Sequence, residues 1–253
     1  MKWSVVKNLM LGLLMVMNVF MIGSMLLQRF NDEKIPPLVT AAAIDALDNN
    51  GIRCDTALMP DNYLTVRTFS GRFYNAMELS RMFFGEELAF QTEDRTLIAR
   101  QGAAELRVED EHFTYNSGAA AAASGERELR LALKAFGLDM SRAAYNGGGE
   151  FACVYDGRPV FGMYLRAAVD ADGRLVSLDA RWPSIGHALG RQTGISIIGC
   201  IPEVISRFPE GGTVSGLKAG YSPVINETTG TCSFVPAWQI TMKNGRNEIF
   251  VVE

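Results

Sequence analysis

The sequence predicts an α+β protein that begins with a transmembrane helix and continues into an extracellular part of helices and antiparallel strands. Residues 9–27 are apolar and uncharged, whereas later apolar positions recur at helical or alternating spacing. The net charge of the 253-residue chain is −4, yet residues 1–28 hold only two of its 24 basic groups and none of its 28 acidic ones. The two parts therefore differ physically, and the acidic balance of the larger part argues against nucleic acid as a partner.

The apolar run at 9–27 has the length of a membrane span. Its nineteen residues would cover about 28 Å as a helix, close to the ~30 Å hydrocarbon core of a bilayer. A cleaved signal peptide has a shorter apolar region and a small-residue cleavage site, and residues 24–31 lack such a site. We therefore expect an uncleaved anchor in the cell membrane. A cytoplasmic leader, 1–8, precedes it, and the bulk of the chain lies outside.

Four helices are expected after a polar tether at 28–37. Pro36 and Pro37 suit a first helical turn, and Gly51 suits the end of that helix. Asn75 and Glu78 form a capping box that opens a second helix, which ends at Gly85. The third and fourth helices are indicated by apolar positions at helical spacing: Leu129, Ala132, Leu133 and Phe136, then Ile201, Val204, Ile205 and Phe208.

Between these helices the apolar spacing changes to every second residue, which predicts antiparallel strands. Residues 62–69 are expected to turn at Ser70–Gly71, and Asn244–Gly245 is the strongest hairpin signal in the chain. The small, uncharged tract at 117–125 suggests either a domain boundary or the first turn of the third helix, since alanine is the best helix former. As a boundary it separates two extracellular domains, 38–118 and 119–253, each built of helix-plus-antiparallel-sheet (PepSY/cystatin-like) units. The other expected strands are LAFQT, RTLIAR, AELRV, HFTYN, FACVY, PVFGMYLRAAV, RLVSLDARW, GTVSGLKAGYSPVI, CSFVPAWQITM and EIFVV.

Groups that carry catalysis are sparse in the sequence. Its two histidines, His112 and His187, lack the neighbouring acid and nucleophile that a hydrolase triad needs, and Ser184 lies in no nucleophile motif. Residues 170–173 resemble part of a calcium loop, but position twelve of that loop would be Arg181, so a tight turn explains them better. The glycine run at 147–149 is not followed by the Lys-Ser/Thr of a phosphate loop. We therefore expect no metal, no cofactor and no enzymatic activity.

The four cysteines leave one hypothesis of chemical reactivity. Cys54, Cys153, Cys200 and Cys232 show neither zinc-ligand spacing nor the pattern of a compact disulfide scaffold. Cys200 precedes the expected fourth helix, and a helix N-terminus lowers the pKa of a thiol. The alternative for Cys200 is a small buried residue. Asn226-Glu227-Thr228 spells a glycosylation sequon, which has meaning only in a eukaryotic secretory route.

The two ends of the chain resemble the YycI family. The start reads Met1-Lys2-Trp3-Ser4 before the apolar run, and the end reads VPAWQI at 235–240, followed by Asn244–Gly245 and Phe250–Val251. YycI proteins are regulators of the WalK/WalR two-component system of Gram-positive bacteria. Lys2 departs from the acidic residue expected there, and the alanine tract and the cysteines match no feature of the family.

The resemblance implies a non-enzymatic single-pass membrane regulator that contacts a WalK-like sensor histidine kinase, together with a YycH-like protein, in cell-wall homeostasis. An alternative is a PepSY-like extracellular binding or protease-inhibitor module, and a third hypothesis is an envelope enzyme that uses Cys200 or Ser184. Asn18 would lie at mid-membrane, where its amide either hydrogen-bonds to another helix or is simply tolerated. The candidate transmembrane contacts under the resemblance are Trp3, Gly12, Asn18, Gly23 and Ser24.

Overall fold

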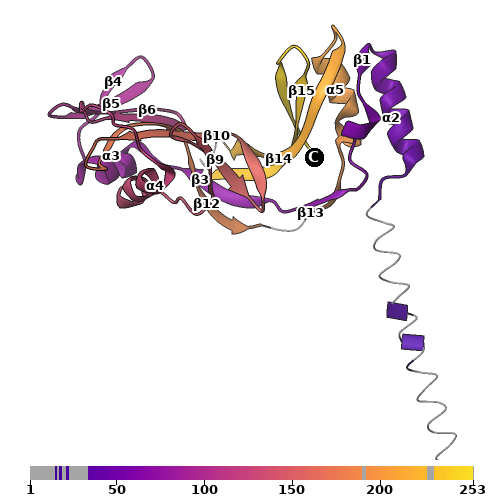
Figure 1. Ribbon diagram of the computed structural model, residues 1–253, viewed down its shortest axis with the longest axis horizontal. Helices are drawn as coiled ribbons and strands as arrows, with labels where there is room; N and C mark the ends of the chain where they lie inside the picture. Colours follow the sequence, from indigo (N-terminus) through magenta and orange to yellow (C-terminus); the bar gives the residue numbers. More distant parts are fainter. Residues whose placement is uncertain are drawn as a thin grey trace, which may run out of the picture. The chain divides into compact units, whose positions relative to one another are not determined.

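The computed structural model describes residues 34–189, 192–226 and 231–252, together with Met15, Met17, Asn18, Met21 and Ile22. The chain forms two compact units (Figure 1). Unit 1 comprises residues 1–65 and 193–214, and unit 2 comprises residues 66–192 and 215–253. The division expected from the sequence, at 118/119, falls inside unit 2.

Unit 1 is a small helical unit in which α2 packs against β1 and α5. Its core includes Leu47 of α2, Ile52 of β1 and Val204 of α5, all at most 2% exposed. The proline start of α2 and the apolar face of α5 were both predicted. The elements of this part of the chain are α2 (Pro37–Asn49), β1 (Ile52–Arg53), η1 (Thr56–Leu58), β2 (Leu64–Val66), β13 (Gln192–Ile195), η2 (Ile197–Cys200), α5 (Ile201–Arg207) and the first residues of β14 (Gly212–Asn226).

Unit 2 is built on a large mixed sheet with the strand order β12-β3-β15-β14-β10-β11-β7-β6-β5-β4, to which β8, β9 and β16 add. The β10–β14 pair is parallel. The elements, in chain order, are β3 (Phe69–Phe73), α3 (Ala76–Phe84), β4 (Gln91–Glu93), β5 (Thr96–Gln101), β6 (Ala104–Glu109), β7 (His112–Asn116), α4 (Glu126–Ala135), β8 (Ala143–Gly147), β9 (Glu150–Tyr155), β10 (Arg158–Val169), β11 (Leu175–Arg181), β12 (Pro183–Ala188), the remainder of β14, β15 (Thr231–Met242) and β16 (Asn247–Val251).

The predicted fold class was wrong. One large mixed sheet replaces the expected separate helix-plus-antiparallel-sheet units, because strands far apart in sequence pair with one another. In the part of the chain that the structure describes, no helix is long and apolar enough to cross a membrane. The predicted span at 9–27 lies outside the described residues, except for the five named above.

Within unit 2, two segments repeat the same order of one helix and four antiparallel strands. The first module, residues 76–116, runs α3-β4-β5-β6-β7, and the second module, residues 126–181, runs α4-β8-β9-β10-β11. Their last strands, β7 and β11, pair antiparallel, with Thr114 opposite Asp179. The spatial order β4-β5-β6-β7-β11-β10-β9-β8 is therefore the same read outward from the β7–β11 pair in either direction, so the two modules are related by an approximate two-fold.

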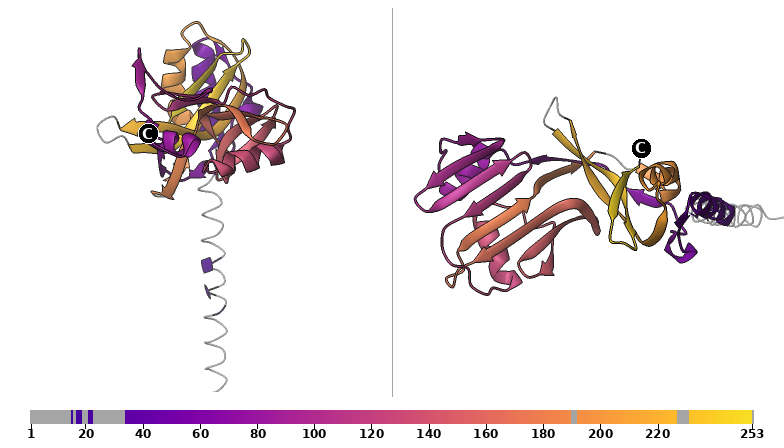
Figure 2. Two further views of the ribbon diagram at one scale, coloured as in Figure 1. Left: turned by 90° about the vertical axis from the view of Figure 1, so that its left-hand side faces the viewer. Right: turned by 90° about the horizontal axis from the view of Figure 1, so that it is seen from above.

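Both module helices lie on the same face of this sheet, α3 against β5 and β6 and α4 against β10 and β11 (Figures 1 and 2). Phe83 of α3 stacks on Tyr115 of β7 and on Phe136, which follows α4, with ring centroids 4.7 and 5.2 Å apart. Burial of Leu79, Phe113, Leu129, Leu165 and Leu178 completes the core on this side. The opposite face of the sheet carries no helix among the described residues.

A second aromatic cluster packs strand β3 against the C-terminal strands. Phe69 stacks on Tyr155 and Phe234, with centroids 3.8 and 4.8 Å apart. The predicted turn at Ser70–Gly71 was wrong, because both residues lie inside β3. A Cβ at Gly71 would lie 2.4 Å from the Phe234 ring, so glycine here permits close strand approach instead of marking a turn.

Candidate functional site

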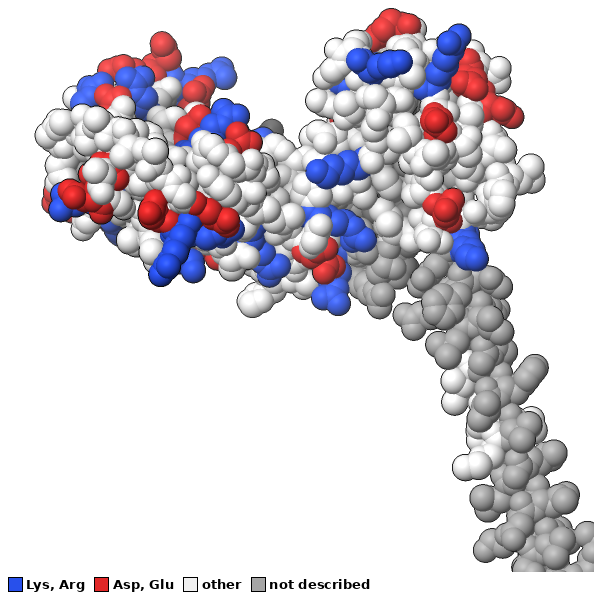
Figure 3. All heavy atoms as spheres, in the orientation of Figure 1, with Lys and Arg blue, Asp and Glu red and all other residues white. Residues whose placement is uncertain are grey.

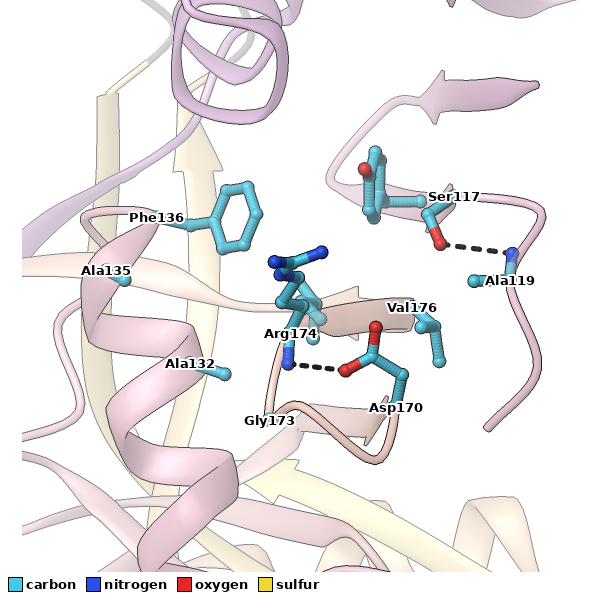
Figure 4. A pocket seen from close by; sticks show the side chains of 11 residues that line it. Ser117, Ala119, Ala132, Ala135, Phe136, Asp170, Gly173, Arg174 and Val176 are labelled. Carbon is cyan, nitrogen blue, oxygen red and sulfur yellow. Dashed lines mark hydrogen bonds between the residues drawn. The ribbon is translucent and has the colours of Figure 1, made fainter. Parts of the chain in front are cut away.

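One candidate site is a groove of about 510 Å³ in unit 2, between α4 and the start of β11 (Figure 4). Its walls come from α4, the end of β7, the segment that follows β7 and the β10–β11 turn. The lining is mostly apolar or small. The lining residues are Tyr115, Ser117, Ala119, Ala132, Ala135, Phe136, Asp170, Gly173, Arg174, Leu175 and Val176.

The two ends of the β7–β11 pair differ in the size of the side chain that follows them. Counted from the paired residues Thr114 and Asp179, Ser117 lies three residues beyond the first and Trp182 three residues beyond the second. Trp182 is 1% exposed, and its indole N–H donates to the carbonyl of Asp139 at 3.2 Å. The large indole thus fills one end of the shared sheet, whereas a serine leaves the other end open.

The alanine tract after Ser117 borders the groove with small side chains. Ser117 donates its backbone N–H to Val176 at 2.8 Å, and Ala122 donates to Val169 at 2.8 Å. These two bonds hold the tract beside β11 and the end of β10. The residues between them are exposed and carry no side chain larger than a methyl group, so the tract borders the groove without filling it.

One cation points into the groove. The guanidinium of Arg174 extends beside Phe136 in Figure 4. Among the described residues it makes no hydrogen bond or ion pair. Asp170, the only carboxylate in the lining, accepts the backbone N–H groups of Asp172 and Arg174 at 2.9 Å through Oδ1. The predicted tight turn at 170–173 is therefore confirmed, and its geometry directs Arg174 toward the apolar walls.

A second candidate surface is the helix-free face of the eight-stranded sheet. A row of cross-strand partners runs over five strands, from Arg107 through Thr114, Asp179 and Arg166 to Glu150. Arg166 donates to Glu150 at 2.9 Å, and the two side chains are 60% and 38% exposed. Acidic and basic side chains are interspersed over the part of unit 2 seen in Figure 3. This surface is polar and exposed, and it carries both acidic and basic side chains.

His112 belongs to this same face. Its Nε2 lies 2.7 Å from Oδ1 of Asp179, which also accepts the Tyr164 hydroxyl at 3.1 Å. The three side chains come from β7, β10 and β11 and link the two modules. The sequence did not predict the acid beside His112, because the two residues are 67 positions apart. His187 and Ser184 both lie in β12, where Ser184 pairs with Arg72 and the His187 carbonyl accepts the Ser70 hydroxyl at 3.2 Å.

The reactive-thiol hypothesis for Cys200 is not supported. Cys200 is 4% exposed, and burial, with a further contribution from Glu203, raises the pKa of its thiol to about 11. The alternative of a buried cysteine is therefore confirmed. Burial raises the pKa of Cys153 to about 12 and that of Cys232 to about 11, and it also raises the pKa of the half-buried Cys54. All four cysteines are free.

The remaining candidates from the sequence lie in a turn, in a helix or outside the described residues. The glycine run at 147–149 forms the β8–β9 turn, and all three residues have positive φ. Asn18 is helical and exposed, while Trp3, Gly12, Gly23 and Ser24 lie outside the described residues, as do two of the three sequon positions. No set of three or more His, Cys, Asp or Glu side chains within the described ranges is arranged to hold a metal ion.

Comparison with known proteins adds no assignment, since neither a family model nor a curated protein matches this chain.

Proposed function

We propose that this protein is a non-enzymatic regulator, held at the cell membrane by its apolar N-terminal segment, that contacts a sensor histidine kinase of a cell-wall two-component system. Its N-terminus is cytoplasmic, the bulk of the chain is extracellular, and a YycH-like protein is a further partner. The resemblance of both chain ends to the YycI family supports the identity of the kinase. The uncharged run at 9–27 supports the membrane location.

The observation that carries this proposal is the helix-free face of the two-module sheet. Its charged side chains lie in one plane and follow the strand register across both modules. Interfaces of regulatory proteins use such ordered charges for specificity and rapid encounter more than for affinity. The row from Arg107 to Glu150 therefore supports recognition by contact.

The ion pairs on this face contribute little to the stability of the fold. Its ion pairs are exposed, with Arg107 and Arg166 at 52% and 60%. Pairs of this kind stabilise a fold by only about 0–1 kcal/mol each. A partner with complementary charges can therefore replace them at little cost to the fold.

The first test is co-purification of the full-length chain with its cognate kinase from membranes. We expect association, and we expect its loss when residues 1–28 are exchanged for an unrelated anchor. Failure of the native chain to associate would contradict the proposal. The kinase should also change its autophosphorylation rate in the presence of the native chain.

The second test concerns the face itself. Arg107→Glu with Arg166→Glu should weaken kinase association about tenfold or more, because like charges would oppose the partner. The matched control is Arg127→Glu with Lys134→Glu, which makes the same charge change on exposed positions of α4. Equal loss in the two double variants would exclude the face as the contact surface.

The groove favours a second candidate, an extracellular binding or inhibitory module of the PepSY type. In that case the exported part acts through a pocket and not through the chain's N-terminal segment. The exchange of residues 1–28 would then leave the association unchanged, which is the opposite of the result expected above.

A further inference from the structure

The structure assigns a ligand class to the groove between α4 and β11: we propose that it binds a small amphipathic carboxylate, with an apolar or aromatic body on the groove walls and the carboxylate on Arg174. This inference rests on the groove alone and does not depend on the kinase contact.

The walls fit an apolar body. Tyr115 and Phe136 provide aromatic surface, Leu175 and Val176 provide the floor, and Ala132 is 6% exposed on the α4 side. Ligand pockets of about 300–1,000 Å³ commonly combine such walls with a few polar groups that fix orientation. At about 510 Å³ the groove suits a ligand of small-metabolite size.

The charge fits a single carboxylate. A guanidinium presents parallel N–H groups that match a carboxylate in a two-point contact. Arg174 makes no ion pair or hydrogen bond with its guanidinium in the described structure, so it is available for a ligand. It is also the only cation among the lining residues. A dianion would leave negative charge close to Asp170, whereas a monoanion balances Arg174.

The shape is specific to this end of the sheet. At the other end of the β7–β11 pair, beyond β11, lies Trp182, which is 1% exposed and donates its indole N–H to the carbonyl of Asp139. Small residues, Ser117 and Ala119, stand where the groove opens. The groove is thus a difference between two otherwise similar modules.

The test uses 4-phenylbutyrate as the probe and the full-length chain in phosphatidylcholine nanodiscs, with empty nanodiscs as the blank. Saturation-transfer NMR and titration calorimetry should show saturable binding of one probe per chain. Arg174→Gln should weaken it about tenfold or more, since a charged hydrogen-bonded contact is lost. Arg95→Gln, an exposed arginine in the β4–β5 turn, is the matched control and should bind as the native chain does.

Two blocking variants and a neutral analogue of the probe complete the test. Ala135→Leu, at an exposed helix position in the lining, and Ser117→Trp, which copies the other module, should both block the probe while circular dichroism stays native. The neutral 4-phenylbutan-1-ol should bind about tenfold more weakly than the acid. No saturable binding above empty discs, equal binding of acid and alcohol, or unchanged binding by both Arg174→Gln and Ala135→Leu would overturn the proposal.

Discussion

The two modules of unit 2 share one order of helix and strands, yet they end differently. After β11 the chain places Trp182 under the sheet, where it is 1% exposed and hydrogen-bonded. After β7 it places Ser117 and a run of alanines, and a groove opens. The comparison teaches that a repeated scaffold can keep one end for stability and leave the other for binding.

The largest expected effect is at Trp182. Trp182→Ala removes a fully buried indole and leaves the Asp139 carbonyl without its partner, so the free energy of unfolding should fall by about 3–5 kcal/mol. Ser117→Ala at the corresponding position should change it by less than about 0.5 kcal/mol. Urea unfolding of the full-length chain in one detergent measures both. Similar losses in the free energy of unfolding at the two positions would contradict the proposed difference between the two ends.

Two neighbouring glycines in the β8–β9 turn of the second module give the next contrast. Gly149, in the β8–β9 turn, has φ of 83°, and a Cβ there would lie 2.5 Å from the Ala167 carbonyl oxygen. Gly149→Ala should therefore destabilise by about 3 kcal/mol. Gly148→Ala is the control: φ is 59° and nothing lies within 4 Å of a Cβ, so about 1 kcal/mol is expected. Equal effects in thermal unfolding would exclude the close approach.

A smaller effect distinguishes the two helix starts. Glu78 of α3 accepts from Arg72 at 2.6 Å and from the N–H of Asn75, and the Arg72 hydrogen bond is the main cause that lowers the pKa of Glu78 below its ordinary value. Because the folded-state pKa is the lower one, this carboxylate stabilises the fold above about pH 4.5, and the contribution is lost as the pH falls further.

Glu78→Gln should cost about 0.5–1 kcal/mol at pH 7 and reduce the loss of stability between about pH 5 and pH 3. Glu128 of α4 accepts only the N–H of Gly125 in the described structure, at 2.8 Å. Glu128→Gln should cost less at pH 7. Unfolding curves at several pH values check both, and an unchanged pH profile for Glu78→Gln would count against the role of Arg72.

Local structure was largely predictable because its signals are short in range. The capping box of Asn75 and Glu78 and the turn at Asn244–Gly245 were both predicted and confirmed. The partners of strands were not predictable, since alternation shows that a strand exists and not which strand it meets. The β7–β11 pair and the parallel β10–β14 pair are of this kind, and they turn the expected separate units into one mixed sheet.

The groove could not be found from the sequence for the same reason. Ser117 and Trp182 correspond only through the β7–β11 register, and Arg174 in a turn is an ordinary exposed residue until the turn is placed beside Phe136. One weak signal was present. The alanine tract is an unusual feature of the sequence, but its composition predicts a domain boundary and not the border of a groove.

The central claim is that the helix-free face, and not the helix-covered face, meets the kinase. The most direct measurement is photo-crosslinking in membranes from a benzoylphenylalanine at Thr114, at the centre of that face, and from one at Lys134 on α4. We expect a crosslink to the kinase from position 114 and none from position 134. A crosslink from position 134 alone, or none from either position while the complex still co-purifies, would contradict it.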